Sequence, residues 1–181
     1  MFKEYTGDLL LTPCPTVLVT VKSGNAENVL AISWTGIACS HPEYVTISVN
    51  PKRFSHSMLL ESGKFCINIP GAEHLEAVDY CGSYSGRDTD KFLKCGFTKK
   101  YVSDCILIEQ CKMHILCEVE KILDLGSHHL FVAKVTGKYL NIDENDEIHD
   151  ILNPIVYYRP YYYKLDNKKL GFYGYTKKEN K

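Results

Sequence analysis

The sequence lacks several features that would assign its class at once. None of its apolar runs approaches the roughly 18 residues of a membrane span, and its first residues have neither the basic nor the apolar region of a secretory signal. Basic and acidic residues nearly balance, with a formal net charge of -1, so the whole chain has no attraction to nucleic acid. We therefore expect a cytoplasmic protein with neither a membrane nor a nucleic-acid partner.

Short motifs for the common nucleotide and metal sites are missing too. There is no G-x-G-x-x-G after a strand and no G-x-x-x-x-G-K, which speaks against a Rossmann site and a P-loop. The cysteines form no C-x2-C or C-x4-C pair, so a structural zinc or an iron–sulfur cluster has little support. We expect no metal centre.

Cysteine itself is plentiful, with eight residues in the chain. The even count is compatible with four disulfides, but a chain this long and core-rich does not need them. We favour buried, reduced thiols that pack as small hydrophobes. Cys105, Cys111 and Cys117 are evenly spaced, six residues apart, and would share one face if that stretch were a strand.

The hydrophobic pattern is that of a strand-rich chain. Its 181 residues fit one domain, or one domain with a small appendage. Short helices are expected at 55–61, where Ser55 is a candidate cap and Gly63 the stop, and at 72–80. A polar loop is expected at 141–150, and an extended tail from 166 onward. Strands are expected at 16–21, 29–37, 44–50, 65–69, 113–123 and 129–135, and a last one, broken by Pro160, at 157–163.

Many short strands with two or three short helices favour an antiparallel barrel or sandwich over a parallel α/β fold. A ligand would then bind at the rim, and three segments are candidates for building it. The run at 28–34 combines hydroxyl and aromatic groups. The segment at 48–55 ends a strand in a basic turn with a serine at a helix N-terminus, which predicts an anion site. A helix cap beside a solvated Lys-Arg pair is the alternative.

The third segment, Ser-Gly-Arg-Asp-Thr-Asp-Lys-Phe at 85–92, has the period of neither a helix nor a strand. Its amide, hydroxyl and guanidinium groups suit phosphate, whereas a solvated surface loop is the plain alternative. Two separate phosphate-binding segments and the lone Trp34 indicate a phosphorylated aromatic ligand.

In this order the segments resemble the flavin reductase-like family of FMN-binding split barrels, and within it the flavoredoxin-type NAD(P)H:flavin oxidoreductases. The resemblance spans about residues 9–164. The blocks that carry it are Pro-Cys-Pro-Thr-Val-Leu-Val-Thr at 13–20, residues 28–34, His-Pro at 41–42, Asn-Pro-Lys-Arg-Phe-Ser-His at 50–56, Phe-Cys-Ile-Asn-Ile-Pro at 65–70, Tyr-Cys-Gly at 80–82, the run at 85–92 and Gly-Ser-His at 126–128.

The resemblance implies a mainly β protein, an antiparallel split β-barrel of Greek-key type that is FMN-binding over residues 1–165, with a C-terminal extension at 166–181. It also implies a homodimer with FMN near the subunit interface. The ring of FMN would lie against Ala31, Ile32, Ser33 and Trp34. Strand contacts would come from Ser48, Val49 and Asn50, and the phosphate would be held by Arg53 and Ser55. The ligand would be covered by Ser85, Gly86, Arg87 and Lys91.

His128 matches the histidine of the family's Gly-Asp-His and is the candidate catalytic residue, near the approach of nicotinamide. Two positions depart from the pattern. Ala31 stands where such proteins often carry threonine, and Ser127 replaces the aspartate that would orient His128. A surface strand residue is the plain alternative for His128 and its neighbour His129.

The expected activity follows from the resemblance: NADH or NADPH reduces bound FMN, and electrons pass to a second flavin, an iron chelate or a protein. Flavin supplies the redox chemistry, so no nucleophile is needed. One alternative is a flavoredoxin-type electron carrier without nicotinamide activity. Another is a flavin-binding or nucleic-acid-associated barrel without redox turnover. The sequence does not choose between the two nicotinamide donors or name the acceptor.

Overall fold

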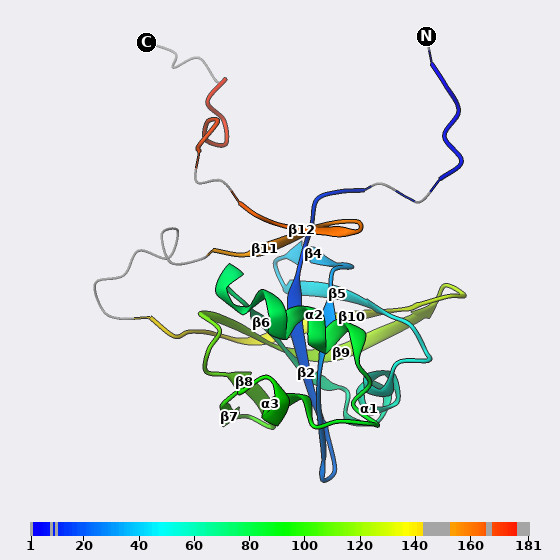
Figure 1. The fold of residues 1–181 in the computed structure, drawn as a ribbon, viewed down its shortest axis with the longest axis vertical. Helices are drawn as coiled ribbons and strands as arrows, with labels where there is room; N and C mark the ends of the chain where they lie inside the picture. Colours follow the sequence, from blue (N-terminus) through cyan, green and yellow to red (C-terminus); the bar gives the residue numbers. More distant parts are fainter. Residues whose placement is uncertain (1, 8, 10, 143–152, 166–167, 177–181) are drawn as a thin grey trace.

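A computed structural model describes residues 2–7, 9, 11–142, 153–165 and 168–176 (Figure 1). Within them the chain is mainly β and antiparallel. The strands are β1 (Cys14–Pro15), β2 (Val17–Ser23), β3 (Ala26–Ile32), β4 (Thr35–Ser40), β5 (Glu43–Val49), β6 (Lys64–Ile69), β7 (Lys99–Val102), β8 (Cys105–Ile108), β9 (Met113–Asp124), β10 (His129–Leu140), β11 (Ile155–Tyr158) and β12 (Tyr161–Lys164). The helices are α1 (Phe54–Ser62), the 3₁₀ turn η1 (Ala72–His74), α2 (Leu75–Ser83) and α3 (Lys91–Lys94).

The main sheet has seven strands in the order β3-β2-β6-β9-β10-β5-β4. Its edge strands β3 and β4 are joined by only Ser33 and Trp34. Because two residues cannot span an open sheet, the sheet curls until its edges meet. The carbonyl of Trp34 in this link accepts from the Ser48 amide of β5 at 2.9 Å, which continues the pairing of β4 with β5. The result is a barrel that is split between β3 and β5.

The barrel is packed on both faces of β2, where every residue from Val17 to Val21 is buried. The inward side chains of β2 meet those of β5, β6 and β10, and α1 adds Met58 and Leu59 to the same cluster. On the outward face, Leu18 of β2 and Val29 of β3 pack beneath α2, α3 and β8. Such double coverage explains why β2 is apolar without alternation.

Smaller sheets flank the barrel. The strands β7 and β8 form a hairpin, and β1, β11 and β12 form a three-stranded sheet. Figure 1 shows β11 and β12 at the end of the barrel where the N-terminal segment leaves it. The break predicted at Pro160 is confirmed, since Arg159 and Pro160 make the turn between β11 and β12. No helix in the described ranges has both the length and the apolar character needed to cross a membrane.

Several predicted elements need correction. The predicted strand at 29–37 is two strands, because the chain must pass from the neighbour of β2 to the neighbour of β5. The helix predicted at 72–80 begins as η1 and continues as α2 to Ser83. In the tail, residues 173–176 form a turn. Most of the loop predicted at 141–150, and tail residues 166–167 and 177–181, lie outside the described residues.

All eight cysteines are free thiols, and five of them are buried as predicted for small hydrophobes: Cys66, Cys81, Cys105, Cys111 and Cys117. The stretch that holds Cys105, Cys111 and Cys117 is not one strand, so the condition under which they would share a face is not met. Cys105 lies on β8, Cys111 in the following turn and Cys117 on β9, because the chain reverses direction between them. Burial raises the pKa of the Cys111 thiol to about 12, so it stays protonated.

Candidate functional site: a two-part groove at the barrel split

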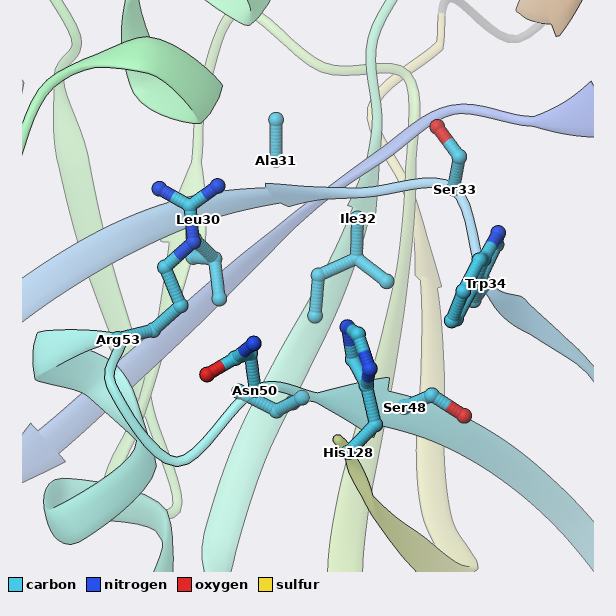
Figure 2. A pocket seen from close by; sticks show the side chains of 10 residues that line it. Leu30, Ala31, Ile32, Ser33, Trp34, Ser48, Asn50, Arg53 and His128 are labelled. Atoms are coloured by element: carbon cyan, nitrogen blue, oxygen red, sulfur yellow. The ribbon is translucent and has the colours of Figure 1, made fainter. Parts of the chain in front are cut away.

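One cavity lies where the barrel splits, and we name it the edge cavity. It has a volume of about 180 Å³. Figure 2 shows Arg53 on one side of it and Trp34 with His128 on the other. The lining residues are Leu30, Ala31, Ile32, Ser33, Trp34, Ser48, Val49, Asn50, Arg53 and His128.

Strand edges supply backbone polar groups to the edge cavity, beside its polar side chains. β3 hydrogen-bonds to β2 along one side only, and its other side is the free edge of the sheet. β4 pairs with β5 as far as Ile47, and the Ser48 amide bonds to Trp34, so only the end of β5 after Ser48 extends past β4. The unpaired strand edges therefore offer donors and acceptors to a planar ligand, much as an exposed edge offers them to another strand.

His128 and Trp34 form one wall of the edge cavity. Their rings lie 4.7 Å apart, centroid to centroid. His128 precedes β10, and its Nδ1 lies 3.0 Å from the Ser127 hydroxyl. The serine that replaces the aspartate of Gly-Asp-His therefore still contacts the imidazole, as a neutral hydroxyl in place of a carboxylate.

The second cavity, which we name the basic cavity, has a volume of about 150 Å³ and shares Leu30 and Arg53 with the first. Four of its lining residues are cationic, and among the described residues that line it none is acidic. This charge imbalance favours an anionic ligand. The full lining is Asn28, Leu30, Lys52, Arg53, Phe54, Ser55, Tyr84, Ser85, Gly86, Arg87 and Lys91.

The first turn of α1 borders the basic cavity. Arg53 is the N-cap residue, and it makes no side-chain cap bond. The first amides of a helix have no partner within it, and the helix dipole adds positive potential there. The Arg53 guanidinium is held by the Gly82 carbonyl at 3.0 Å. Cation and amides thus converge at one place.

Ser55 does not cap α1, so that prediction is wrong. It lies inside the helix, where its buried hydroxyl accepts a hydrogen bond from the Asn28 amide at 2.7 Å. The helix begins earlier than the sequence suggested, because Asn50 organises the preceding turn by accepting from the Lys52 amide. The Ser55 hydroxyl still borders the basic cavity.

The loop between α2 and α3 closes the cavity from the other side. The Asp88 amide donates to the Ser85 carbonyl at 3.1 Å and fixes the turn of this loop. The Asp90 side chain caps α3. A Cβ on Gly86 would overlap the Asn28 amide, so only glycine permits this approach. The Arg87 guanidinium donates to the Lys52 carbonyl at 3.3 Å and stacks over the Phe54 ring.

Lys91 differs from the covering role predicted for it. Its side chain is buried, and the ammonium donates to the Val29 carbonyl at 3.0 Å and to the Cys81 carbonyl at 2.8 Å. Desolvation is the main cause that lowers its pKa. Lys91 borders the basic cavity as a fixed charge that ties α3 to β3 and α2.

The structure brings all the predicted site residues to the two cavities, although it does not test their roles. Tyr84 was missed, whereas Asn28, Leu30, Lys52 and Phe54 lie in the predicted rim segments but were not named as site residues. Asn28 carried a signal, because a buried amide in an apolar strand needs a partner. Leu30 follows it on the same face by strand alternation. No group of three or more His, Cys, Asp or Glu suited to a metal occurs in the described part of the chain.

Comparison with known proteins places the chain in a family. The family model of the flavin reductase-like domain matches residues 9–166. The chain belongs to that family. The match covers both cavities and every strand of the barrel.

Individual relatives agree. An uncharacterized protein of Pyrococcus abyssi is 31% identical over 129 residues, which cover 71% of this chain and 75% of that one. Flavoredoxin from Methanosarcina acetivorans has a similar structure, with a TM-score of 0.88, 21% identity and coverage of 98% of both chains. An FMN-binding protein from Thermus thermophilus has a TM-score of 0.79 and 21% identity, with coverage of 94% and 97%. These structural similarities establish the fold.

Proposed function

We propose that this family member binds FMN along the groove, with the ring at the edge cavity and the phosphate in the basic cavity. The observation that carries the proposal is the union of the two cavities. The edge cavity, bordered by unpaired strand edges, adjoins the basic cavity at Arg53. Four cationic residues line the basic cavity, and the described residues of its lining include no acidic one. A ligand with a planar polar ring and a phosphate satisfies both.

The residues fit such a ligand in separate ways. Arg53 and Arg87 present guanidinium groups, which suit a phosphate better than an ammonium does. Lys52 and the first amides of α1 add to the same charge. Trp34 offers an aromatic face and the strand edges offer amides and carbonyls to the ring. The Ala31 methyl contributes none of the hydrogen bonding that a threonine would supply there.

Bound flavin would supply the electron-transfer chemistry, and the chain would bind, orient and shield it. We propose NADH or NADPH as the electron donor, with a second flavin, an iron chelate or a protein as acceptor. His128, beside Trp34 in the lining of the edge cavity, is the residue that would meet the donor.

The test begins with the absorbance spectrum of the purified protein, before and after incubation with FMN and gel filtration. A flavin band that stays with the protein supports the proposal. Anaerobic addition of NADH or NADPH should then bleach that band. A protein that retains no FMN at neutral pH would overturn the binding proposal.

A second candidate function is an electron carrier that takes no electrons from nicotinamide. The contact of His128 with the neutral Ser127 hydroxyl favours it, since no carboxylate fixes the imidazole there. In this case a reduced iron–sulfur protein such as ferredoxin bleaches the bound flavin, whereas neither nicotinamide does. The two donors therefore separate the candidates.

We also propose a homodimer. β4 is an edge strand of six residues, five of them exposed, with 85% of Ile37 open to solvent. Beside it the N-terminal segment exposes Leu9 and Leu11. An exposed apolar edge strand is a hazard unless a partner covers it. Light scattering should give twice the chain mass, and Ile37→Lys should give the monomer; a monomeric wild-type protein would contradict the proposal.

A further inference from the structure

Two histidines from distant parts of the chain meet behind the groove. Nε2 of His56 lies 3.0 Å from Nδ1 of His129, and their rings meet edge to face at 72° with centroids 4.7 Å apart. His56 is buried, with 6% of its surface exposed, and its ring also packs against Phe131. On the far side, Nε2 of His129 lies 3.7 Å from the Asp124 carboxylate.

This contact joins the two ends of the groove. His56 lies in the first turn of α1, directly after Ser55 of the basic cavity. His129 is the first residue of β10, directly after His128 of the edge cavity, and it pairs with Val49 on β5. The hydrogen bond between imidazoles therefore links the phosphate end to the His128 end, in addition to the pairing of β10 with β5.

The bond can hold only one proton between the two facing nitrogens. Asp124 favours the His129 tautomer that carries its proton on Nε2, which leaves Nδ1 as the acceptor and makes His56 the donor. If both rings become cations, an N–H faces an N–H, and the hydrogen bond is replaced by repulsion. The contact thus exists only while the pair carries at most one positive charge.

Several other charged groups on the packed elements are engaged elsewhere. Asp124 of β9 reaches the pair, while Glu120 of β9 accepts from Tyr44 and Glu61 of α1 accepts from the Ser23 hydroxyl. Arg53, ahead of α1, donates to Gly82. Charged residues of the remaining packed strands are engaged as follows: Lys22 of β2 over Tyr101, Glu27 of β3 with Lys99, Glu43 of β5 with Lys138, and Lys64 of β6 with Asp104.

We propose that His56 and His129 are positioning residues of the flavin site, which hold α1 and His128 at a fixed spacing through one shared proton and release them when a second proton binds. The inference rests on the proposed function. Its consequence is a proton-linked affinity: FMN binds more weakly at acid pH because the groove loses its fixed width. By linkage, bound FMN in turn disfavours the second proton.

The sign of this effect sets it apart from simple electrostatics. An added positive charge near a phosphate site should raise affinity for an anion, whereas loss of the contact lowers it. Burial lowers the pKa of His56, and the charge of His129 acts in the same direction. The neutral donor form of His56 is therefore the one present at neutral pH.

The first test needs no flavin. Imidazole ¹⁵N shifts, followed by NMR over pH 4–8 in the wild-type protein, should show His56 titrating below the ordinary value of about 6.5. In His129→Gln the side-chain amide can still accept a hydrogen bond from His56 but carries no charge. Because the charge of His129 lowers the pKa of His56, the His56 midpoint should move to higher pH in this variant. An unchanged midpoint in His129→Gln would overturn the inference and leave the proposed function untouched.

The second test measures FMN affinity between pH 7.5 and pH 5 in the wild type, His129→Gln, His129→Leu and the control His74→Gln on η1. The FMN phosphate titrates near pH 6 in every sample and so cancels in the comparison. The wild type and the control should lose roughly fivefold more affinity than His129→Gln on acidification. His129→Leu should already bind roughly fivefold more weakly than His129→Gln at pH 7.5. Parallel pH profiles would overturn the inference, whereas absence of FMN binding at every pH would overturn the proposed function alone.

Discussion

The edge cavity and the basic cavity share Leu30 and Arg53 but are built by different means. The edge cavity joins strand edges that the barrel leaves unpaired to the aromatic rings of Trp34 and His128. The basic cavity owes its character to side chains from α1 and the loop before α3. We therefore expect substitutions in the basic cavity to weaken FMN more than riboflavin, and substitutions in the edge cavity to weaken both ligands alike. Comparing FMN with riboflavin, which lacks the phosphate, isolates the two contributions.

Arg53→Ala should produce the largest effect on affinity. The guanidinium is preoriented by the Gly82 carbonyl and stands at the N-cap of α1. Its loss should weaken FMN binding roughly 30- to 100-fold, as expected for charge-assisted hydrogen bonds. Riboflavin affinity, measured by the same fluorescence titration, should stay within about twofold. The exposed Lys121→Ala is the matched control. An equal loss for both ligands would break the division between the cavities.

Trp34→Ala should have the second-largest effect on affinity and should not discriminate between FMN and riboflavin. Removing the indole takes away an aromatic face beside His128, which is worth roughly tenfold in affinity. FMN and riboflavin should be weakened equally, because the change lies at the ring end. Trp34→Phe keeps an aromatic face and should restore most of the binding. A loss confined to FMN would show that Trp34 acts on the phosphate end.

Arg87→Ala should weaken FMN binding about fivefold, because this guanidinium lies on a solvent-exposed loop where charge is screened. Riboflavin binding should not change. The measurement is again fluorescence titration, at low and at high salt, and the difference between wild type and variant should shrink as salt rises. Unchanged FMN affinity at low salt would mean that the loop is a surface loop only.

Lys91→Met should have the smallest effect on affinity, within about twofold for both ligands. Its hydrogen bonds hold the backbone carbonyls of Val29 and Cys81, so its loss should lower the free energy of unfolding by about 2 kcal/mol. Urea denaturation measures this, and the exposed Lys94→Met on the same helix is the control. A large loss of FMN affinity with unchanged stability would return Lys91 to the ligand-binding role.

Much of the barrel could be predicted from local pattern. Alternation over 44–50 is real because β5 has one face in the core, and its predicted bounds differ from Glu43–Val49 by one residue at each end. The side chains of the basic cavity could be predicted as well, because a short segment rich in cationic, hydroxyl and glycine residues is typical of an anion-binding site. The resemblance to the flavin reductase-like family supplied the order in which these segments assemble.

Other features depend on pairing that local pattern does not reveal. The break at Ser33 and Trp34 contains neither glycine nor proline. It arises because the chain changes strand partners there. The burial of Lys91 follows from two carbonyls on other elements. His56 and His129 are 73 residues apart, and only the pairing of β10 with β5 brings them together.

The two-residue link between β3 and β4 has a consequence for the order of folding. The link keeps the two margins of the sheet close throughout folding, so the edge cavity takes its shape only when the long-range pairings of β2 with β6 and of β10 with β5 close the sheet between them. Flavin added to a refolding chain would therefore be captured only at the end, after the hydrophobic interior has formed. A lag between the recovery of secondary structure and the quenching of flavin fluorescence would time that closure directly, and lengthening the link by two glycines should prolong the lag.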